Sequence, residues 1–241
     1  MSYFKDFPLQ FYSFGNGEES TLIQNIATYV DILDDIKVNS SFYQDYYIQG
    51  GERPDQTAFM LYKNPHMHWS FYFMNDKIRE QGWPLEYTQV VERVKSDYSD
   101  HVLTTQDAIH SILAVGDTIT GAISNAVGII THKNLDLGQI YVELQGVETF
   151  QQGEMVVSDT DINENVVIVA ATQGHLSVHH YEVDGEHVDL DLTDMSVPMN
   201  AVPITNLDFY VEENDKLKQI RVVKPTEINT VEKLFKEALR S

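Results

Sequence analysis

The charged residues divide the chain into three segments, and this division constrains the architecture more than any single motif does. Residues 99–205 carry 16 acidic side chains but one basic side chain, Lys133. The flanking segments are more balanced, because residues 1–98 carry 8 basic and 14 acidic side chains and residues 206–241 carry 7 of each. A change of charge pattern at both ends of a segment indicates a separate domain. We therefore expect three parts, with boundaries near residues 98 and 205.

The acidic middle segment has the spacing of an antiparallel β domain. Short runs rich in β-branched residues, such as GQIYVEL at 138–144 and GEMVVSD at 153–159, are separated by glycine, asparagine and aspartate. Such runs are typical of strands joined by tight turns. The sequence predicts an α+β protein in which an acidic, antiparallel β-rich domain, a small barrel or a sandwich, is inserted over 99–205.

The first segment, 1–98, is expected to be mainly helical. Apolar residues recur three and four positions apart over 20–36, where Ser20 or Thr21 is placed to cap a helix. Proline stands at three further positions that the first turn of a helix tolerates: Pro54, Pro65 and Pro84. We therefore predict a helix over 20–36 and one helix beginning near each of these prolines.

The last segment, 206–241, predicts a strand followed by a helix. QIRVVK at 219–224 is a strand-like run that Pro225 ends. TEINTVEKLFKEAL at 226–239 places its apolar side chains along one face of a helix. We expect this strand and helix to pack on the first segment or to dock beside it.

The composition excludes several classes of function. The net charge of −21 repels phosphate groups, so nucleic acid and membranes are not expected as partners, whereas basic protein surfaces are. The chain has no cysteine, which excludes disulfides and thiolate metal sites. Its longest apolar run, VVIVAA at 166–171, is too short to span a bilayer. Residues 1–14 lack the basic and apolar regions of a secretory signal peptide. We expect a soluble protein.

Four histidines between 175 and 187 raise the question of a metal-dependent enzyme. In a strand, His175 and His179 would share one face, and a bulge would bring His180 to the same face. The spacing matches no established ligand pattern such as HExxH. The preferred interpretation is therefore a set of solvated histidines that titrate near neutral pH, and we predict no metal ligand and no cofactor.

No catalytic arrangement of residues is expected either. Paired acids such as Asp34 and Asp35 lie in polar runs, whereas acid–base catalysis needs two carboxylates in different environments facing one cleft. The chain has no GxSxG, Walker or GxGxxG motif after a strand. DTDINENVV at 159–167 alternates acids like a calcium loop but lacks its glycine and final glutamate, so it is predicted to be a turn. The sequence predicts a protein that is not an enzyme.

The most aromatic stretch, 46–76, allows two interpretations. Exposed rings would stack on sugars or bases, whereas buried rings would form a core. Helical spacing places five large apolar side chains on compatible faces: Phe59, Tyr62, Trp69, Phe73 and Met74. We predict that most of them are core. The segment 68–73 is apolar nearly all round, so it needs cover on more than one side, which a partner surface would provide.

Four separated blocks of sequence together resemble a known family. They are YFKDFP at 3–8, YYIQGGERPDQTAFMLYKNPHMHW at 46–69, GWPL at 82–85 and ENDKLKQIRVVKPTEI at 213–228. In this order they resemble the LysM-bearing baseplate wedge subunit family of contractile-tailed bacteriophages. The resemblance covers residues 1–98 and 206–241, and the family pattern has no counterpart of the acidic segment.

The resemblance implies a LysM-like body formed by the two ends of the chain, and a structural role in the virion. In the family this subunit joins adjacent wedges and helps to close six of them into a ring around the tail hub, after assembly in the host cytoplasm. The implied partners are other wedge subunits and subunits that lie near the hub or initiate the sheath. The candidate interface residues are Tyr47, Arg53, Pro54, Tyr62, Trp69, Trp83, Leu217, Ile220 and Ile228.

A LysM module that binds peptidoglycan or chitin oligomers is the alternative that the same pattern implies. Such a module usually has Gly-Asp-Thr-Leu after its first strand, whereas this chain has Gly51, Glu52, Arg53 and Pro54. Proline removes a backbone donor from the loop that would hold a sugar. This difference disfavours glycan binding.

Overall fold

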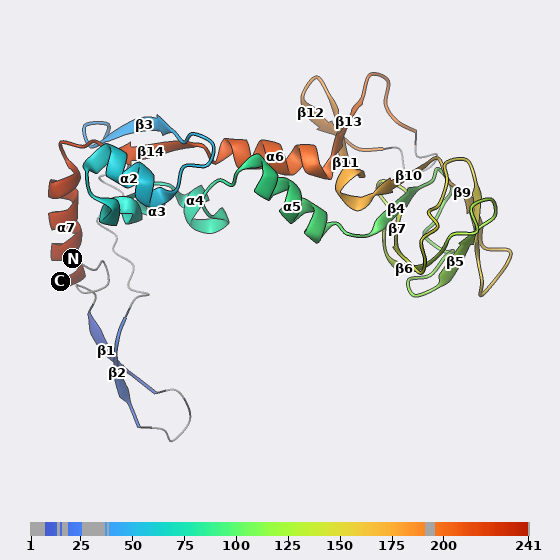
Figure 1. Cartoon of the computed structure of the whole chain (residues 1–241), viewed down its shortest axis with the longest axis horizontal. Coiled ribbons are helices and arrows are strands. Elements are labelled where there is room, and N and C mark those ends of the chain that lie inside the picture. The colour runs from blue at the N-terminus through green and yellow to red at the C-terminus, as the bar shows by residue number, and fades with distance from the viewer. Residues whose placement is uncertain are drawn as a thin grey trace. The chain divides into compact units, whose positions relative to one another are not determined.

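The computed structural model describes residues 8–13, 15, 19–25, 37, 39–190 and 196–240, and it divides the chain into two compact units (Figure 1). We call residues 1–86 and 214–241 the terminal unit, and residues 87–213 the inserted unit. Both contain helices and antiparallel strands, which confirms the predicted α+β class. Within the described ranges, no helix is long and apolar enough to cross a bilayer.

The terminal unit is built on two strands that come from opposite ends of the chain. Strand β3 (Tyr43–Tyr47) pairs antiparallel with β14 (Gln219–Val223). Its helical elements are α2 (Pro54–Tyr62), the 3-10 helix η2 (Pro65–His68), α3 (Trp69–Met74), α4 (Asp76–Gln81) and α7 (Ile228–Arg240). The predicted C-terminal strand and helix are therefore both present.

The predicted helix starts at Pro54 and Pro65 are confirmed. Pro54 is the first residue of α2, where the Arg53 N–H donates to Gln56 Oε1 at 3.3 Å. Pro65 is the first residue of η2, where Asn64 Oδ1 accepts from the His66 N–H at 3.0 Å. In both places a side chain supplies a hydrogen bond that the helix end lacks. The third predicted helix, α5 (Tyr87–Asp97), begins three residues after its proline.

The terminal unit has two clusters of buried side chains. In the first cluster, Trp69 stacks on Phe235 of α7 with ring centroids 4.6 Å apart. In the second, Phe71 and Ile78 pack against Ile220 of β14. Amphipathic α7 thus contributes one face to the core, as its apolar spacing predicts.

The helix predicted over 20–36 is wrong where the structure describes it. Residues Thr21–Gln24 form strand β2, which pairs antiparallel with β1 (Leu9–Tyr12). The β-branched residues Thr21 and Ile23 alternate with Leu22 and Gln24, so this segment suits an extended strand. Residues 26–36 lie outside the described residues.

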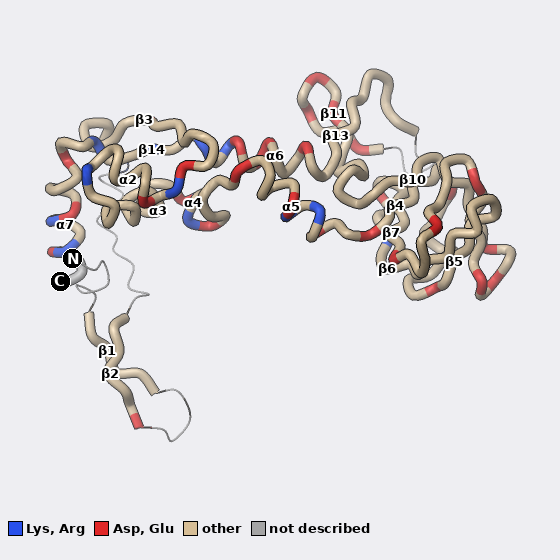
Figure 2. Tube along the Cα trace, in the orientation of Figure 1, with Lys and Arg blue, Asp and Glu red and all other residues tan. Residues whose placement is uncertain are grey.

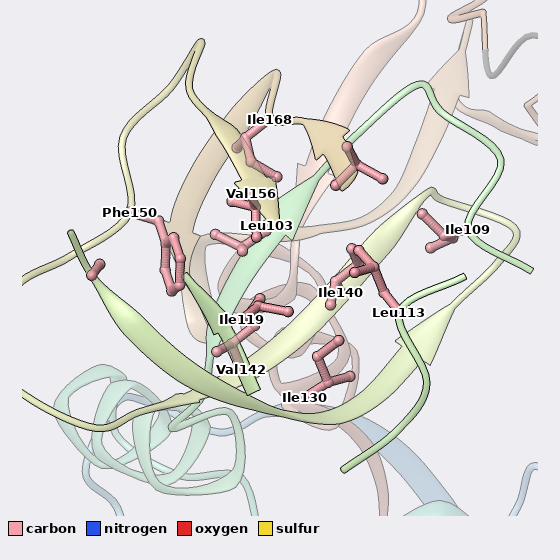
Figure 3. Close-up of a cluster of buried hydrophobic side chains, with 12 residues drawn as sticks. Leu103, Ile109, Leu113, Ile119, Ile130, Ile140, Val142, Phe150, Val156 and Ile168 are labelled. Atoms are coloured by element: carbon pink, nitrogen blue, oxygen red, sulfur yellow. The ribbon is translucent and has the colours of Figure 1, made fainter. Parts of the chain in front are cut away.

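The inserted unit contains a seven-stranded antiparallel sheet with the order β10-β4-β7-β6-β5-β8-β9. Its strands are β4 (His101–Thr104), β5 (Thr118–Gly121), β6 (Val127–Asn134), β7 (Gln139–Leu144), β8 (Met155–Ser158), β9 (Asn165–Val167) and β10 (Ala170–Gln173). Residues 168–169 alone separate the two edge strands, β9 and β10, so the sheet curls back on itself like a small barrel. Figure 3 shows the core of this sheet, in which branched aliphatic side chains and Phe150 fill the space between the strands.

A second sheet and a helix complete the inserted unit. The sheet has the order β12-β11-β13, formed by β11 (Val178–Val183), β12 (Glu186–Val188) and β13 (Val202–Thr205). Helix α6 (Asn206–Lys216) follows β13 and was not predicted. Asn206, at its start, is buried and donates from Nδ2 to Gly174 O at 2.8 Å and to Ser177 Oγ at 3.0 Å. This amide therefore ties α6 to the 3-10 helix η3 (Gly174–Leu176) and the residue that follows it.

Candidate protein-interaction site

Three of the candidate interface residues lie around the start of α2 and the end of β3. Tyr47 is 54% exposed. Arg53 is also exposed, and its Nε lies 3.1 Å from Asp55 Oδ1 in a solvent-exposed ion pair that costs little to break. Pro54 is half-buried. Tyr47 and Arg53 therefore offer an aromatic ring and a cation to a partner.

The other six candidates are held in the body of the terminal unit. The structure buries four of them: Trp69, Leu217, Ile220 and Ile228. Tyr62 is half-buried and donates from Oη to Val223 O at 2.9 Å. Burial raises the pKa of Tyr62 to about 12, so this hydroxyl stays a donor at neutral pH. Trp83 donates from Nε1 to Glu52 O at 2.7 Å. These six side chains therefore stabilise the body of the terminal unit, and they do not offer contact area as Tyr47 and Arg53 do.

Helix α2 exposes apolar side chains that the sequence did not assign to the surface. Phe59, predicted as core, is 55% exposed, and the neighbouring Met60 is also exposed. The helix buries Thr57 and Ala58 instead, which turns Phe59 outward. The other predictions for the aromatic stretch agree with the structure, because Trp69 and Met74 are buried and Tyr62 and Phe73 are half-buried.

The β1–β2 hairpin is a second exposed apolar surface. Phe11 lies opposite Leu22, and Leu9 lies opposite Gln24, so the three apolar side chains share one face of the ribbon. All three are at least half exposed. The two strands contain no charged residue. An isolated two-stranded ribbon is marginally stable in water, so this face suits contact with another protein surface.

The histidine cluster is arranged differently from the prediction. His175 lies in η3 and is buried, so it does not share a strand face with His179. The register of β11 against β13 shifts between Val178 and His180, which is the bulge that brings His179 and His180 together. Their Nδ1 atoms are 2.9 Å apart.

Three imidazoles of this cluster, those of His179, His180 and His187, have protein partners. His179 stacks on Phe209 with centroids 4.0 Å apart. His180 Nε2 lies 3.0 Å from Glu182 Oε1, and His187 Nε2 lies 3.2 Å from Asp189 Oδ1. Among the residues that the structure describes, no group of three or more histidine, aspartate or glutamate side chains is placed to hold a metal ion.

The partly buried imidazole of His179 predicts a pH dependence of the three-stranded sheet. Burial lowers the pKa of His179 below 6.5, and the neighbouring His180 and His187 lower it further. The folded state therefore binds this proton more weakly than the unfolded state, so stability is present above pH 6.5 and is lost as the pH falls through the lower, folded pKa.

We expect an NMR titration of His179 with a midpoint below 6.5, together with faster amide exchange in β11 as the pH falls. The variant His179→Gln should weaken this dependence because it removes the titrating group. A midpoint at or above 6.5 would contradict the effect of partial burial and of the neighbouring His180 and His187 on this ring.

One family model matches part of the chain. The family model described as base plate wedge protein 53 matches residues 17–110, which include β3, α2, α3, α4 and α5. No curated protein matches the chain. Over these residues, which are less than half of the chain, the sequence is similar to that of a phage baseplate wedge protein.

Proposed function

We propose that the chain joins adjacent wedges of a contractile phage tail baseplate and helps to close them into a ring around the tail hub. The observation that carries this proposal is the family match over 17–110, combined with the pairing of β3 with β14. Strand β14 lies in the last of the four sequence blocks, far outside the matched residues. The matched segment and this distant block therefore form one folded body.

The side chain of Asn75 strengthens the connection between these two parts. Its Nδ2 donates to Arg221 O at 2.8 Å, and its Oδ1 accepts from the Arg221 N–H at 2.8 Å. The amide thus pairs with the backbone of β14 as a neighbouring strand would. We therefore infer that Asn75 is a scaffold residue of the terminal unit.

The order of elements supports a LysM-like body as part of the proposal. A strand, two helical segments and a second strand occur in the order β3, α2, η2–α3, β14, and the two strands pair antiparallel. The inserted unit enters this order between α4 and β14. The insertion begins and ends at neighbouring points, because the Leu85 N–H donates to Asn214 Oδ1 at 2.7 Å, and a compact body can accept an insertion at such a place.

The exposed aromatic side chains support protein contact as the activity of this body. Tyr47 and Phe59 present large rings to solvent, and aromatic residues supply much of the binding energy at protein interfaces. Neither ring is needed to fill the buried clusters of the terminal unit. Their removal should therefore weaken assembly without unfolding the chain.

Coexpression with the other structural proteins of the same tail tests this proposal. We expect native mass spectrometry to detect a defined complex that contains this chain. The double variant Tyr47→Ala/Phe59→Ala should reduce its yield at least about tenfold, because truncating an interface aromatic commonly costs ~2 kcal/mol or more. Tyr87→Ala removes an equally exposed ring from α5 and should leave the yield unchanged.

Two outcomes contradict the proposal. One is a chain that remains alone in the presence of all neighbouring subunits. The other is a chain that sediments with insoluble peptidoglycan, which would favour the glycan-binding alternative instead.

A further inference from the structure

A pocket of about 350 Å³ opens within the inserted unit. It lies where the end of α5 and the start of β4 meet β6, β7, η3 and α6. The lining side chains that determine its chemistry are Asp97, Tyr98, Asp100, His132, Tyr141 and Tyr210. None of the described residues that line it is a lysine or an arginine. The wall therefore combines carboxylates with aromatic rings and lacks a permanent cation.

The aromatic rings of the pocket are arranged in two pairs. His132 stacks on Tyr141 with centroids 3.7 Å apart and an angle of 21° between the ring planes. The hydroxyls of Tyr98 and Tyr210 are 3.0 Å apart, and the centroids of these rings are 5.8 Å apart. The faces of such rings carry negative partial charge and attract organic cations.

The two aspartates place negative charge at the same pocket. Asp100 Oδ2 accepts from Thr131 Oγ1 at 2.6 Å, which fixes the carboxylate beside Tyr141. Asp97 Oδ2 is 3.6 Å from Arg93 Nε on the same helix, and both side chains are more than half exposed. An exposed pair of this kind contributes little, so Asp97 can exchange its partner at small cost.

The tyrosines remain neutral beside these carboxylates. Burial raises the pKa of Tyr98, and its hydrogen bond to Tyr210 and the nearby charge of Asp97 raise it further. Burial also raises the pKa of Tyr141, and the charge of Asp100 acts in the same direction. At neutral pH Tyr98 and Tyr141 therefore add neutral ring faces to the two aspartates.

The inserted unit has three basic residues, and two of them, Arg93 and Lys95, lie on α5, where Arg93 pairs with Asp97. Residues 99–205 contain Lys133 as their one basic residue among 16 acidic ones, and the contrast along the chain is visible in Figure 2. The Nζ of Lys133 donates to Ile109 O at 2.8 Å and to Ile112 O at 3.1 Å, so this amine is committed elsewhere in the unit. The excess of acidic residues gives the inserted unit a negative electrostatic potential, which attracts cationic groups of other molecules.

We propose that this pocket binds a lysine or arginine side chain that a basic segment of a neighbouring protein presents. The carboxylates compensate its charge, and the ring pairs cover its apolar stem and its charged head. Paired rings suit an organic cation better than a metal ion, which needs more oxygen ligands than the two aspartates supply. This inference is independent of the proposed function, because the pocket can bind a cationic side chain in any assembly.

The test uses the full chain and a tetra-arginine peptide as the probe. We expect the peptide to shift the NMR signals of His132 and of the pocket tyrosines, and calorimetry to give a measurable affinity. A tetra-citrulline peptide of the same length, which lacks the charge, should bind at least about tenfold more weakly.

Paired variants separate the pocket from the general acidity of the unit. Asp97→Asn/Asp100→Asn should weaken peptide binding about tenfold or more, and asparagine at 100 can still accept from Thr131. Asp184→Asn/Glu186→Gln removes the same charge at the turn between β11 and β12, where residue 184 has a φ of 53° that asparagine adopts readily. This control should retain nearly full affinity.

A third variant, Tyr210→Ala, removes a partly exposed ring from the pocket without changing the net charge, and it should also weaken binding. Equal losses in the pocket and control variants, or peptide binding that leaves the pocket signals unmoved, would overturn the proposal.

Discussion

The variant Phe71→Ala is expected to lower the free energy of unfolding of the terminal unit by about 3–5 kcal/mol. Phe71 is completely buried, and its ring centroid lies 5.9 Å from that of Tyr62 and 5.6 Å from that of Trp83. Truncation removes apolar contacts and leaves a cavity that the two half-buried rings can fill in part only. Both tryptophans of the chain belong to this unit, so tryptophan fluorescence during urea unfolding reports on it selectively.

The matched control for this prediction is Phe59→Ala. It makes the same chemical change at an exposed position of the same unit, so the free energy of unfolding should change by roughly 0.5 kcal/mol or less. Similar losses in both variants would mean that Phe71 is not the centre of the core.

The variant Glu154→Gln is expected to destabilise the inserted unit by about 2–4 kcal/mol. Glu154 is completely buried, and its carboxylate accepts from the N–H groups of Ile123, Ser124 and Gln151 at 2.6–3.0 Å and from Ser124 Oγ. This carboxylate therefore holds the Gly121–Ala126 turn against the start of β8. The NH₂ of glutamine would face some of these donors and leave them without an acceptor.

The charge of Glu154 also predicts how this loss depends on pH. Burial raises the pKa of Glu154, but the hydrogen bonds from Ser124, Gln151 and Ile123 together outweigh burial and hold the pKa below 4.5. The stabilisation is thus present above pH 4.5 and is lost as the pH falls through the lower, folded pKa. Far-ultraviolet circular dichroism during urea unfolding should show the wild type and the variant converging in stability as the solution becomes acidic. A constant difference over this range would contradict a charged Glu154.

Local sequence patterns predict most of the elements but not their long-range pairing. The β-branched runs of β7 and β8 and the prolines at α2 and η2 are recognisable within a few residues. Thr205 and Asp208 mark the start of α6, because the Asp208 N–H donates to Thr205 Oγ1 at 3.1 Å and the Thr205 N–H donates to Asp208 Oδ2 at 3.3 Å, and this local signal was overlooked. The long-range contacts of Asn206 with Gly174 and Ser177 have no such signal in the sequence. The segment Thr21–Gln24 was assigned to a helix because its apolar spacing fits both periods, and β1 selects the strand by pairing with it.

The same limit applies to the candidate sites. The family resemblance implies Tyr47 and Arg53 as candidates, and the structure leaves both exposed. The exposure of Phe59 depends on which face of α2 packs inward, and that face is chosen by contacts with β14 and α3. The pocket around Tyr98 and Tyr210 brings together residues from separate segments of the inserted unit, and no spacing in the sequence indicates it.

Cryo-electron microscopy of tails assembled from the structural proteins encoded beside this chain, at a resolution that traces side chains, tests the central claim most directly. The proposed function predicts copies of this chain in the baseplate ring, with the terminal unit contacting two adjacent wedges and Tyr47 and Phe59 among its contact residues. A ring that lacks the chain, or a chain that contacts a single wedge only, would contradict the proposed joining role.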